Sequence, residues 1–282
     1  MEYMRRLFIL LAAALAANAL RAERIELSTD CASCVVETDG ARVVSFRGAD
    51  GAEALWNADP VQLTDEKWAH GGIPVCWPWF GVDGRGAFHG TAWRRPFSVV
   101  SRSVRGDQCE LVLARDEGDV RLEYRLVLRD TLELELKTTN HGKSDFVFSA
   151  AFHPYFRVGE RDLSEVEGVG TSAIPVTKSL DDVYPAQPGA WSTYRLRDRS
   201  LGRTLYILFG GANLVNIWNP GAEKDCPGTI PGDEWRRFVC VEPAFGEEPR
   251  PMSLKPGRSA SLRLGIDVRK DIESPCRSGN GR

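Results

Sequence analysis

The strongest constraint on the fold is a strict alternation of apolar and polar residues in the stretch DVRLEYRLVLRDTLELELKTTN, residues 119–140. Apolar side chains recur at every second position from Val120 to Leu128 and again from Leu132 to Leu136, with Arg129-Asp130 between the two runs. A period of two buries one face of a strand and leaves the other in water. The stretch therefore predicts a hairpin in an antiparallel sheet.

Further strand patterns extend this prediction along the chain. Residues 42–56 (RVVSFRGADGAEALW) predict a second hairpin with Asp50-Gly51 as its turn, and residues 259–268 (SASLRLGIDV) predict a late strand. No segment after residue 22 shows a long helical period or a solenoid repeat. We therefore expect an all-β fold, a large antiparallel β-sandwich over residues 23–272, with a flexible tail at 273–282.

The N-terminus predicts export. Met4-Arg5-Arg6 is followed by an apolar run from Leu7 to Ala17, and Ala17-Asn18-Ala19 has the small-x-small form of a signal-peptide cleavage site. The run is short for a membrane span of roughly 20 residues, which favours a cleaved signal peptide at residues 1–22 over an uncleaved anchor. The mature protein is then predicted to be secreted or periplasmic, without stable membrane insertion.

Composition and cysteine usage exclude several classes of function. The formal net charge is -3 and the basic residues are scattered, so no nucleic-acid partner is predicted. Cys31 and Cys34 have CxxC spacing, which allows a local disulfide; a strand pattern follows them, which disfavours a redox motif. Without a second CxxC or paired histidines, no metal site is predicted. Cys76 and Cys240 lie in apolar surroundings and are predicted to be buried thiols. The protein is also predicted to be a monomer.

Few side chains remain that could carry out chemistry. Of the four histidines, His141 lies in a turn and is predicted to be solvated, whereas His70 and His89 adjoin glycines and His153 ends an apolar strand. Glu242 follows the apolar run FVCV, so it is either a buried base with a raised pKa or a rim residue that faces water. A histidine and a glutamate that face one another across a pocket can act as an acid–base pair.

The stretch HGGIPVCWPWFG, residues 70–81, is too rich in proline for a buried strand and too aromatic for an ordinary surface loop. Trp77, Trp79 and Phe80, together with Tyr155, suit the apolar faces of a sugar ring. The alternative is that these rings belong to the hydrophobic core.

In chain order the sequence carries GGIPVCWPWFG, HG, HPYFRVG, DDVY, WNPG and FVCVEPA. This series resembles the D-hexose-6-phosphate mutarotases of the aldose 1-epimerase group, from about residue 25 to about residue 270. The resemblance implies a galactose mutarotase-like β-supersandwich. It also implies an isomerase that interconverts the α and β anomers of a hexose or hexose 6-phosphate by ring opening, with no cofactor.

The same resemblance implies roles for individual residues. Glu242 of VCVEPA would be the base and His153 of HPYF the acid. His89 of the HG motif would hydrogen-bond the sugar ring. Asp181 of DDVY would hold sugar hydroxyls, with Asp182 as the second choice.

Two positions depart from the family pattern at the end of the site that would hold a sugar phosphate. His70 stands where the family has an arginine before the Gly-Gly pair, and Trp93 stands where it has an arginine in an HGxAR motif. Arg94 follows one residue late, and Arg85 or Arg157 could also reach the site. Arginine binds phosphate through two parallel, always-charged contacts, so this end of the site is predicted to be less positive than a sugar-phosphate site.

The predicted substrate-binding residues are therefore His89, Asp181, His70, Trp79 and Arg94. The missing arginines also support a different class of function: an exported carbohydrate-binding protein on the same fold, without turnover. The export signal and the aromatic loop suggest a third alternative, a polysaccharide-associated protein on that fold.

Overall fold

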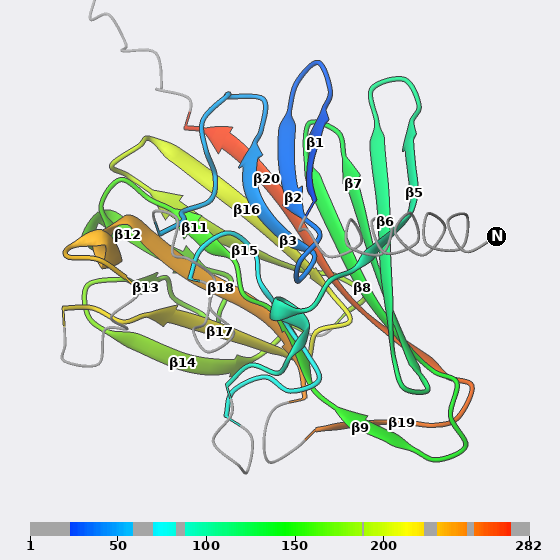
Figure 1. Ribbon diagram of the computed structural model, residues 1–282. Helices are drawn as coiled ribbons and strands as arrows, with labels where there is room; N and C mark the ends of the chain where they lie inside the picture. Colours follow the sequence, from blue (N-terminus) through cyan, green and yellow to red (C-terminus); the bar gives the residue numbers. More distant parts are fainter. Residues whose placement is uncertain are drawn as a thin grey trace, which may run out of the picture.

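A computed structural model of the chain describes residues 23–58, 70–82, 88–187, 189–222, 230–246 and 251–271 (Figure 1). The predicted signal peptide at residues 1–22 and the predicted tail at 273–282 lie outside these ranges. Within them the helical elements are short 3-10 turns at Ala92–Arg94 (η2), Arg161–Leu163 (η3) and Glu234–Arg237 (η4). None of the described helices is long and apolar enough to span a membrane.

The larger layer is a nine-stranded antiparallel sheet, in which every neighbouring pair of strands runs in opposite directions. Its strands in spatial order are β13 (Ile174–Pro175), β12 (Ser164–Glu167), β15 (Ser192–Asp198), β16 (Arg203–Gly210), β20 (Ser259–Lys270), β8 (Leu132–Asn140), β7 (Val120–Leu128), β6 (Cys109–Glu117) and β5 (Ser98–Val104).

The second layer is a six-stranded antiparallel sheet that crosses the first (Figure 1). Its strands in order are β14 (Leu180–Pro185), β17 (Leu214–Asn219), β18 (Phe238–Phe245), β10 (Ala150–Phe152) and β4 (Val75–Cys76), and β11 (Tyr155–Arg157) pairs with β18 beyond β10. Two smaller sheets complete the fold: β1 (Arg24–Ser28), β2 (Ser33–Glu37) and β3 (Arg42–Arg47), and β9 (Phe146–Phe148) with β19 (Met252–Leu254).

Strand β18 is buried on both faces, as its apolar run predicts. Successive side chains of a strand point to opposite faces. Val239 and Val241 face β20 and belong to the main core between the two layers. Cys240 and Ala244 belong instead to two satellite clusters on the far side of the six-stranded sheet. Glu242 lies between them in sequence, so it too points away from the main core.

The described strands confirm the predicted all-β sandwich. Strands β7 and β8 form the predicted hairpin around residues 129–131, and β20 is the predicted late strand. His141 is exposed, and Cys76 and Cys240 are buried, as predicted. Cys31 and Cys34 are free thiols, so they do not form the local disulfide that their spacing allows.

The second predicted hairpin forms only in part. A turn closes at Gly48–Gly51, but the returning arm makes single bridges, of which the one nearest the turn joins Arg47 to Glu53. The Glu53 carboxylate accepts hydrogen bonds from the backbone N–H groups of Phe46 and Leu55. A side chain thus takes backbone donors that a continuous ladder would have used.

Candidate active site

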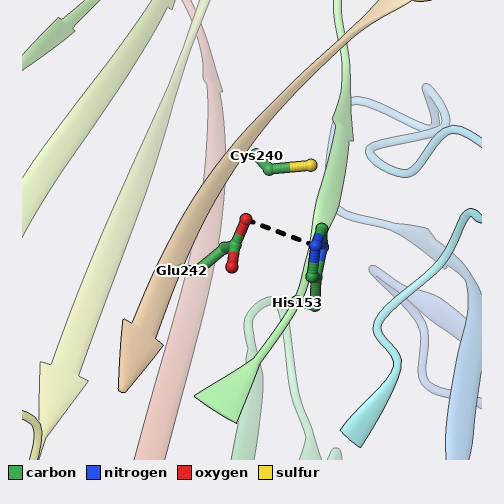
Figure 2. A group of neighbouring side chains, drawn as sticks. All are labelled: His153, Cys240 and Glu242. Carbon is green, nitrogen blue, oxygen red and sulfur yellow. Dashed lines mark ion pairs between the residues drawn. The ribbon is translucent and has the colours of Figure 1, made fainter. Parts of the chain in front are cut away.

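Glu242 lies within β18, with β17 on one side and β10 and β11 on the other. Ala151 pairs with Ala244, and Tyr155 pairs with Cys240. His153 lies midway between the first members of these pairs, and Glu242 lies midway between the second. The same register therefore places His153 directly opposite Glu242. His153 Nε2 and Glu242 Oε1 are 3.5 Å apart, and the two side chains point toward one another (Figure 2).

Pro154 explains why the chain opposite β18 forms two short strands. The N–H groups of His153 and Tyr155 donate to the carbonyls of Pro74 (3.0 Å) and Gly72 (2.9 Å), on the side away from β18. The N–H group of residue 154 would therefore point at β18, and proline has none to donate. The ladder breaks at this residue, which separates β10 from β11 beside the His153 imidazole.

The Glu242 carboxyl group is fully buried, with 0% of the residue exposed. The alternative that this residue is at the rim and faces water is thus wrong. Neither carboxyl oxygen has a hydrogen-bond partner among the described residues. Burial raises the pKa of Glu242 well above its ordinary value, the charge of Asp181 raises it further, and the Asn216 side chain lowers it in part. These shifts favour the protonated form of this carboxyl group.

The His153 imidazole is shifted in the opposite direction. Burial lowers the pKa of His153 well below its ordinary value, and the neighbouring imidazoles of His89 and His70 lower it further. The ring is 5% exposed and stacks on Tyr155, with centroids 4.8 Å apart. These shifts favour the neutral imidazole beside the protonated carboxyl group of Glu242.

His89 lies next to this pair. Its ring centroid is 5.3 Å from that of His153, and its ring stacks on Phe80. The N–H of Gly81 donates to His89 Nδ1 at 3.1 Å, so the neutral ring carries its proton on Nε2. Burial, followed by the charge of His70, lowers the pKa of His89 to about 3. His89 is therefore a neutral hydrogen-bond donor at working pH.

Glycine is required after His89. The backbone of His89 itself has a φ of 54°, in the left-handed region, and Gly90 follows with a φ of 74°. A Cβ atom at Gly90 would lie 2.1 Å from the carbonyl oxygen of Trp77. Only glycine permits this approach, which brings the HG motif back onto the aromatic loop.

The aromatic wall of the site differs from the predicted one. It consists of the half-buried Trp218 and His70, where Trp218 meets the His153 ring edge-on at 5.7 Å and stacks on His70 at 6.3 Å. Tyr155 is 0% exposed and packs in a buried aromatic cluster, so its prediction as a pocket wall is wrong. Trp77 is 1% exposed, belongs to the main core and stacks on Phe146, so its prediction as a pocket wall is wrong.

Phe80 and Trp79 are the other two aromatic residues of this loop that were predicted to line the pocket. Phe80 lines the site through its stacking on His89. Trp79 is half-buried, and its contact with substrate stays a prediction. Gly71 and Gly72, which begin the loop, lie against the backbone of Asn57 and Val43 and serve packing at that point.

Strand parity separates the two candidate aspartates. Asp181 pairs with Trp218 in the register of β14 and β17, and it accepts a 3.4 Å hydrogen bond from the amide of Asn216. Asp182 pairs with Ile217, a residue of the main core, and accepts a hydrogen bond from Tyr184. Asp181 is therefore the aspartate on the Glu242 face.

Two residues of this face were not assigned a role from the sequence. Asn216 pairs directly with Glu242, and Trp218 pairs with Cys240. The alternation in LVNIWN, residues 214–219, places both on one face of β17, and Trp218 lies in the WNPG motif. That alternation could have shown that the two residues share a face of the strand. It could not have shown that this face holds Glu242, or that β18 is the pairing strand.

At the end of the site predicted to be less positive, Trp93 packs with Ala151 and Ala244, which are two positions from His153 and Glu242. The Arg94 guanidinium lies over the Trp93 ring, 5.5 Å from its centroid, and is exposed. Arg157 is exposed and pairs with Phe238, four residues from Glu242 along β18. The remaining candidate, Arg85, lies outside the described residues.

The buried face of β18 also carries a possible metal-ligand set. Donor atoms of His153, Cys240 and Glu242 all lie within 4.8 Å of one another. Figure 2 shows Cys240 and Glu242 projecting from the same strand toward His153.

Comparison with known proteins identifies a family that this chain resembles in sequence. Residues 23–186 match the aldose 1-epimerase family. A "putative glucose-6-phosphate 1-epimerase" of Salmonella typhimurium strain LT2 is 28% identical over 249 residues, which cover 78% of this chain and 83% of that protein. A protein of the same description from Escherichia coli K12 is 27% identical over 260 residues, with 82% and 85% covered.

Solved structures share the fold. The crystal structure of a "putative mutarotase" from Salmonella typhimurium superposes with a TM-score of 0.78 at 23% identity, covering 88% of this chain and 90% of that one. A galactose mutarotase-like protein from Clostridium acetobutylicum superposes with a TM-score of 0.68 at 12% identity, covering 89% and 96%. These likenesses confirm the predicted galactose mutarotase-like sandwich.

Proposed function

The chain belongs to the aldose 1-epimerase family of isomerases, and on that premise we propose that it interconverts the α and β anomers of a hexose, with Glu242 as base and His153 as acid. The observation that carries this assignment is the 3.5 Å approach of His153 Nε2 to Glu242 Oε1, with both groups buried. Anomer interconversion requires only proton transfers, which such a pair can perform.

Ring opening begins when the Glu242 carboxylate takes the proton of the C1 hydroxyl. As the C1–O5 bond breaks, the His153 imidazolium gives its proton to the ring oxygen, and an open-chain aldehyde with a free hydroxyl group results. Rotation about the C1–C2 bond turns the other face of the carbonyl toward that hydroxyl. Closure runs the two proton transfers in reverse, and the pair returns to its starting state.

The opposite pKa shifts of Glu242 and His153 suit this cycle. Burial raises the pKa of Glu242 and lowers that of His153, which favours a proton on the carboxyl group over one on the imidazole. The reactive form, carboxylate with imidazolium, has the same number of protons. A sugar hydroxyl that donates to Glu242 stabilises its carboxylate. Ring opening then places a proton on Glu242 again, in the form that burial favours.

The surrounding residues orient the sugar. His89 presents its Nε2–H beside His153 and hydrogen-bonds the ring, and exposed Asp181 accepts hydrogen bonds from sugar hydroxyls. The half-buried Trp218 packs against an apolar face of the ring, beside His70. Trp79 is assigned a further contact on the strength of its position in the loop.

The C6 end of the sugar determines whether a phosphate is preferred. The names of the relatives favour a hexose 6-phosphate, whereas His70 and Trp93 occupy the two places where the family pattern has arginines. Losing two charge-assisted contacts of roughly 1.5–3 kcal/mol each weakens phosphate binding by orders of magnitude. We therefore propose that free hexoses are accepted, and that Arg94 supplies what phosphate preference remains.

The test of the reaction is NMR or polarimetry on freshly dissolved α-glucose, α-galactose and their 6-phosphates. Purified protein is expected to speed at least one of these anomerisations above buffer, and Glu242→Gln to abolish the gain. Saturable sugar binding by calorimetry without any anomerisation would instead favour the carbohydrate-binding alternative.

The test of the C6 end compares kcat/KM for glucose and glucose 6-phosphate. Arg94→Ala is expected to lower the ratio of phosphate to free sugar, and Arg95→Ala, which removes the adjacent exposed arginine, to leave it unchanged. A strong phosphate preference that Arg94→Ala abolishes would show that the family's arginine has moved one residue along the chain.

Location and assembly complete the proposal. We infer from residues 4–19 that the protein is exported and works outside the cytoplasm, and we propose separately that it is a monomer. N-terminal sequencing of the exported protein and size-exclusion chromatography test the two parts.

A further inference from the structure

Cys240 is a buried side chain of the site that the proposed reaction does not use. It is 0% exposed and, like Glu242 two residues later, points from β18 toward His153 (Figure 2). One thiol, one imidazole and one carboxylate donor atom lie within 4.8 Å of one another. Three different ligand types for a metal ion thus converge from two neighbouring strands.

The distances are close to those of a tetrahedral metal site. With metal–nitrogen and metal–oxygen bonds of about 2.0–2.1 Å, two such ligands are about 3.3 Å apart in a tetrahedron. His153 Nε2 and Glu242 Oε1 are already 3.5 Å apart. A sulfur ligand at about 2.3 Å from the metal lies about 3.6 Å from its neighbours, so the Cys240 thiol needs a movement of about 1 Å.

The charges also match. Both Glu242 oxygens are buried without a hydrogen-bond partner among the described residues, and a buried carboxylate is costly unless it is paired or coordinates a metal. A thiolate and a carboxylate together neutralise a divalent cation, and the protons of both groups leave to solvent. We propose that His153, Cys240 and Glu242 form a site for one Zn²⁺ ion, which excludes the sugar when it is bound.

The ligand set decides the class of metal. Thiolate and imidazole favour Zn²⁺ or Co²⁺ over Mg²⁺ and Ca²⁺, which prefer oxygen ligands. Three protein ligands leave a fourth position open, as in catalytic zinc sites. Here, however, the metal occupies the two groups that the proposed reaction needs, so the ion is an inhibitor. The predicted inhibition rests on the proposed function. Binding of the ion does not, since it follows from the three ligands alone.

The binding test uses Co²⁺ as a spectroscopic probe on the full protein. Titration is expected to produce a thiolate-to-Co²⁺ charge-transfer band that saturates at one equivalent. Cys240→Ala should remove the band, and Cys109→Ala should keep it, because Cys109 is buried in the other sheet and contacts Ser28. Cys240→Ser, which keeps the side-chain size, replaces the alanine variant if that one does not fold. An unchanged band in the Cys240 variants would overturn the proposal.

The inhibition test measures anomerisation in Zn²⁺ with and without a chelator. Inhibition is expected to be reversible, competitive with sugar, and at least tenfold weaker in Cys240→Ala than in Cys109→Ala, each relative to its own metal-free rate. If Co²⁺ binds through Cys240 but Zn²⁺ leaves an active enzyme uninhibited, the exclusion of sugar is wrong. If the metal-free protein anomerises nothing, the proposed function fails, while the binding result stands.

Discussion

The two faces of strand β18 are equally buried but differ in chemistry. Val239 and Val241 pack into the main core against the nine-stranded sheet. On the opposite face, Glu242 and Cys240 approach His153, and the carboxyl oxygens have no hydrogen-bond partner among the described residues. One strand therefore packs the core with Val239 and Val241 and presents Glu242, the proposed base, on its other face.

This difference shows where the fold tolerates a destabilising group. A buried, unpartnered carboxyl group lowers the free energy of unfolding, and it persists because the other face of the same strand is held by close hydrocarbon packing. Variants on the two faces are therefore expected to separate activity from stability.

The largest effect is expected from Glu242→Gln. The amide cannot take the C1 proton, so kcat/KM should fall by about 10²–10⁴-fold, the usual contribution of a general base. NMR of anomer exchange measures the loss, and circular dichroism checks that the fold is intact. Activity within a few-fold of the parent would remove Glu242 from the reaction.

The matching change on the core face is Val241→Ala. Removing two methyl groups from a fully buried position should lower the free energy of unfolding by about 2 kcal/mol. Urea denaturation gives the stability, and kcat/KM of the folded protein should change little. A large loss of activity at unchanged stability would show that the two faces are not independent.

A third prediction concerns the stability of Glu242→Gln at different pH values. The folded state raises the pKa of Glu242, so the folded protein keeps a proton that the unfolded chain releases above pH of about 4.3. Rising pH therefore favours the unfolded state through this group. Glutamine has no such proton, and the variant should gain in Tm over the parent as pH rises from 5 to 8. A constant difference in Tm would contradict the raised pKa.

The smallest effect is expected from Asp181→Asn. The charge of Asp181 raises the pKa of Glu242, and its removal makes protons leave the His153–Glu242 pair more readily. Both limbs of the kcat/KM–pH profile should move to lower pH. Asp182→Asn, on the other face of β14, is the control and should leave the profile in place. Equal shifts in both variants would mean that strand parity does not select the aspartate.

The sequence predicted the strands and the reactive groups separately. Alternation was sufficient for β7, β8 and β20, because a half-buried strand imposes a period of two on its own residues. The apolar run before Glu242 indicated a buried or rim carboxylate but could not decide between them. The aromatic loop shows what the sequence could not predict. Its residue types are the same whether Trp77 faces the core or a pocket. Asn57, which packs against a glycine of this loop, lies in another part of the chain.

By itself, then, the sequence determined the all-β class, the ordered motifs of the family, and Glu242, His153 and His89 as the groups able to move or donate protons. The tertiary structure decided the rest: that His153 lies opposite Glu242, that Asn216 and Trp218 join them, and that Asp181 faces the site. The physical reason is that these placements depend on the register between strands far apart in the chain. A shift of one residue would turn each side chain to the opposite face, and only the packed sheets fix that register.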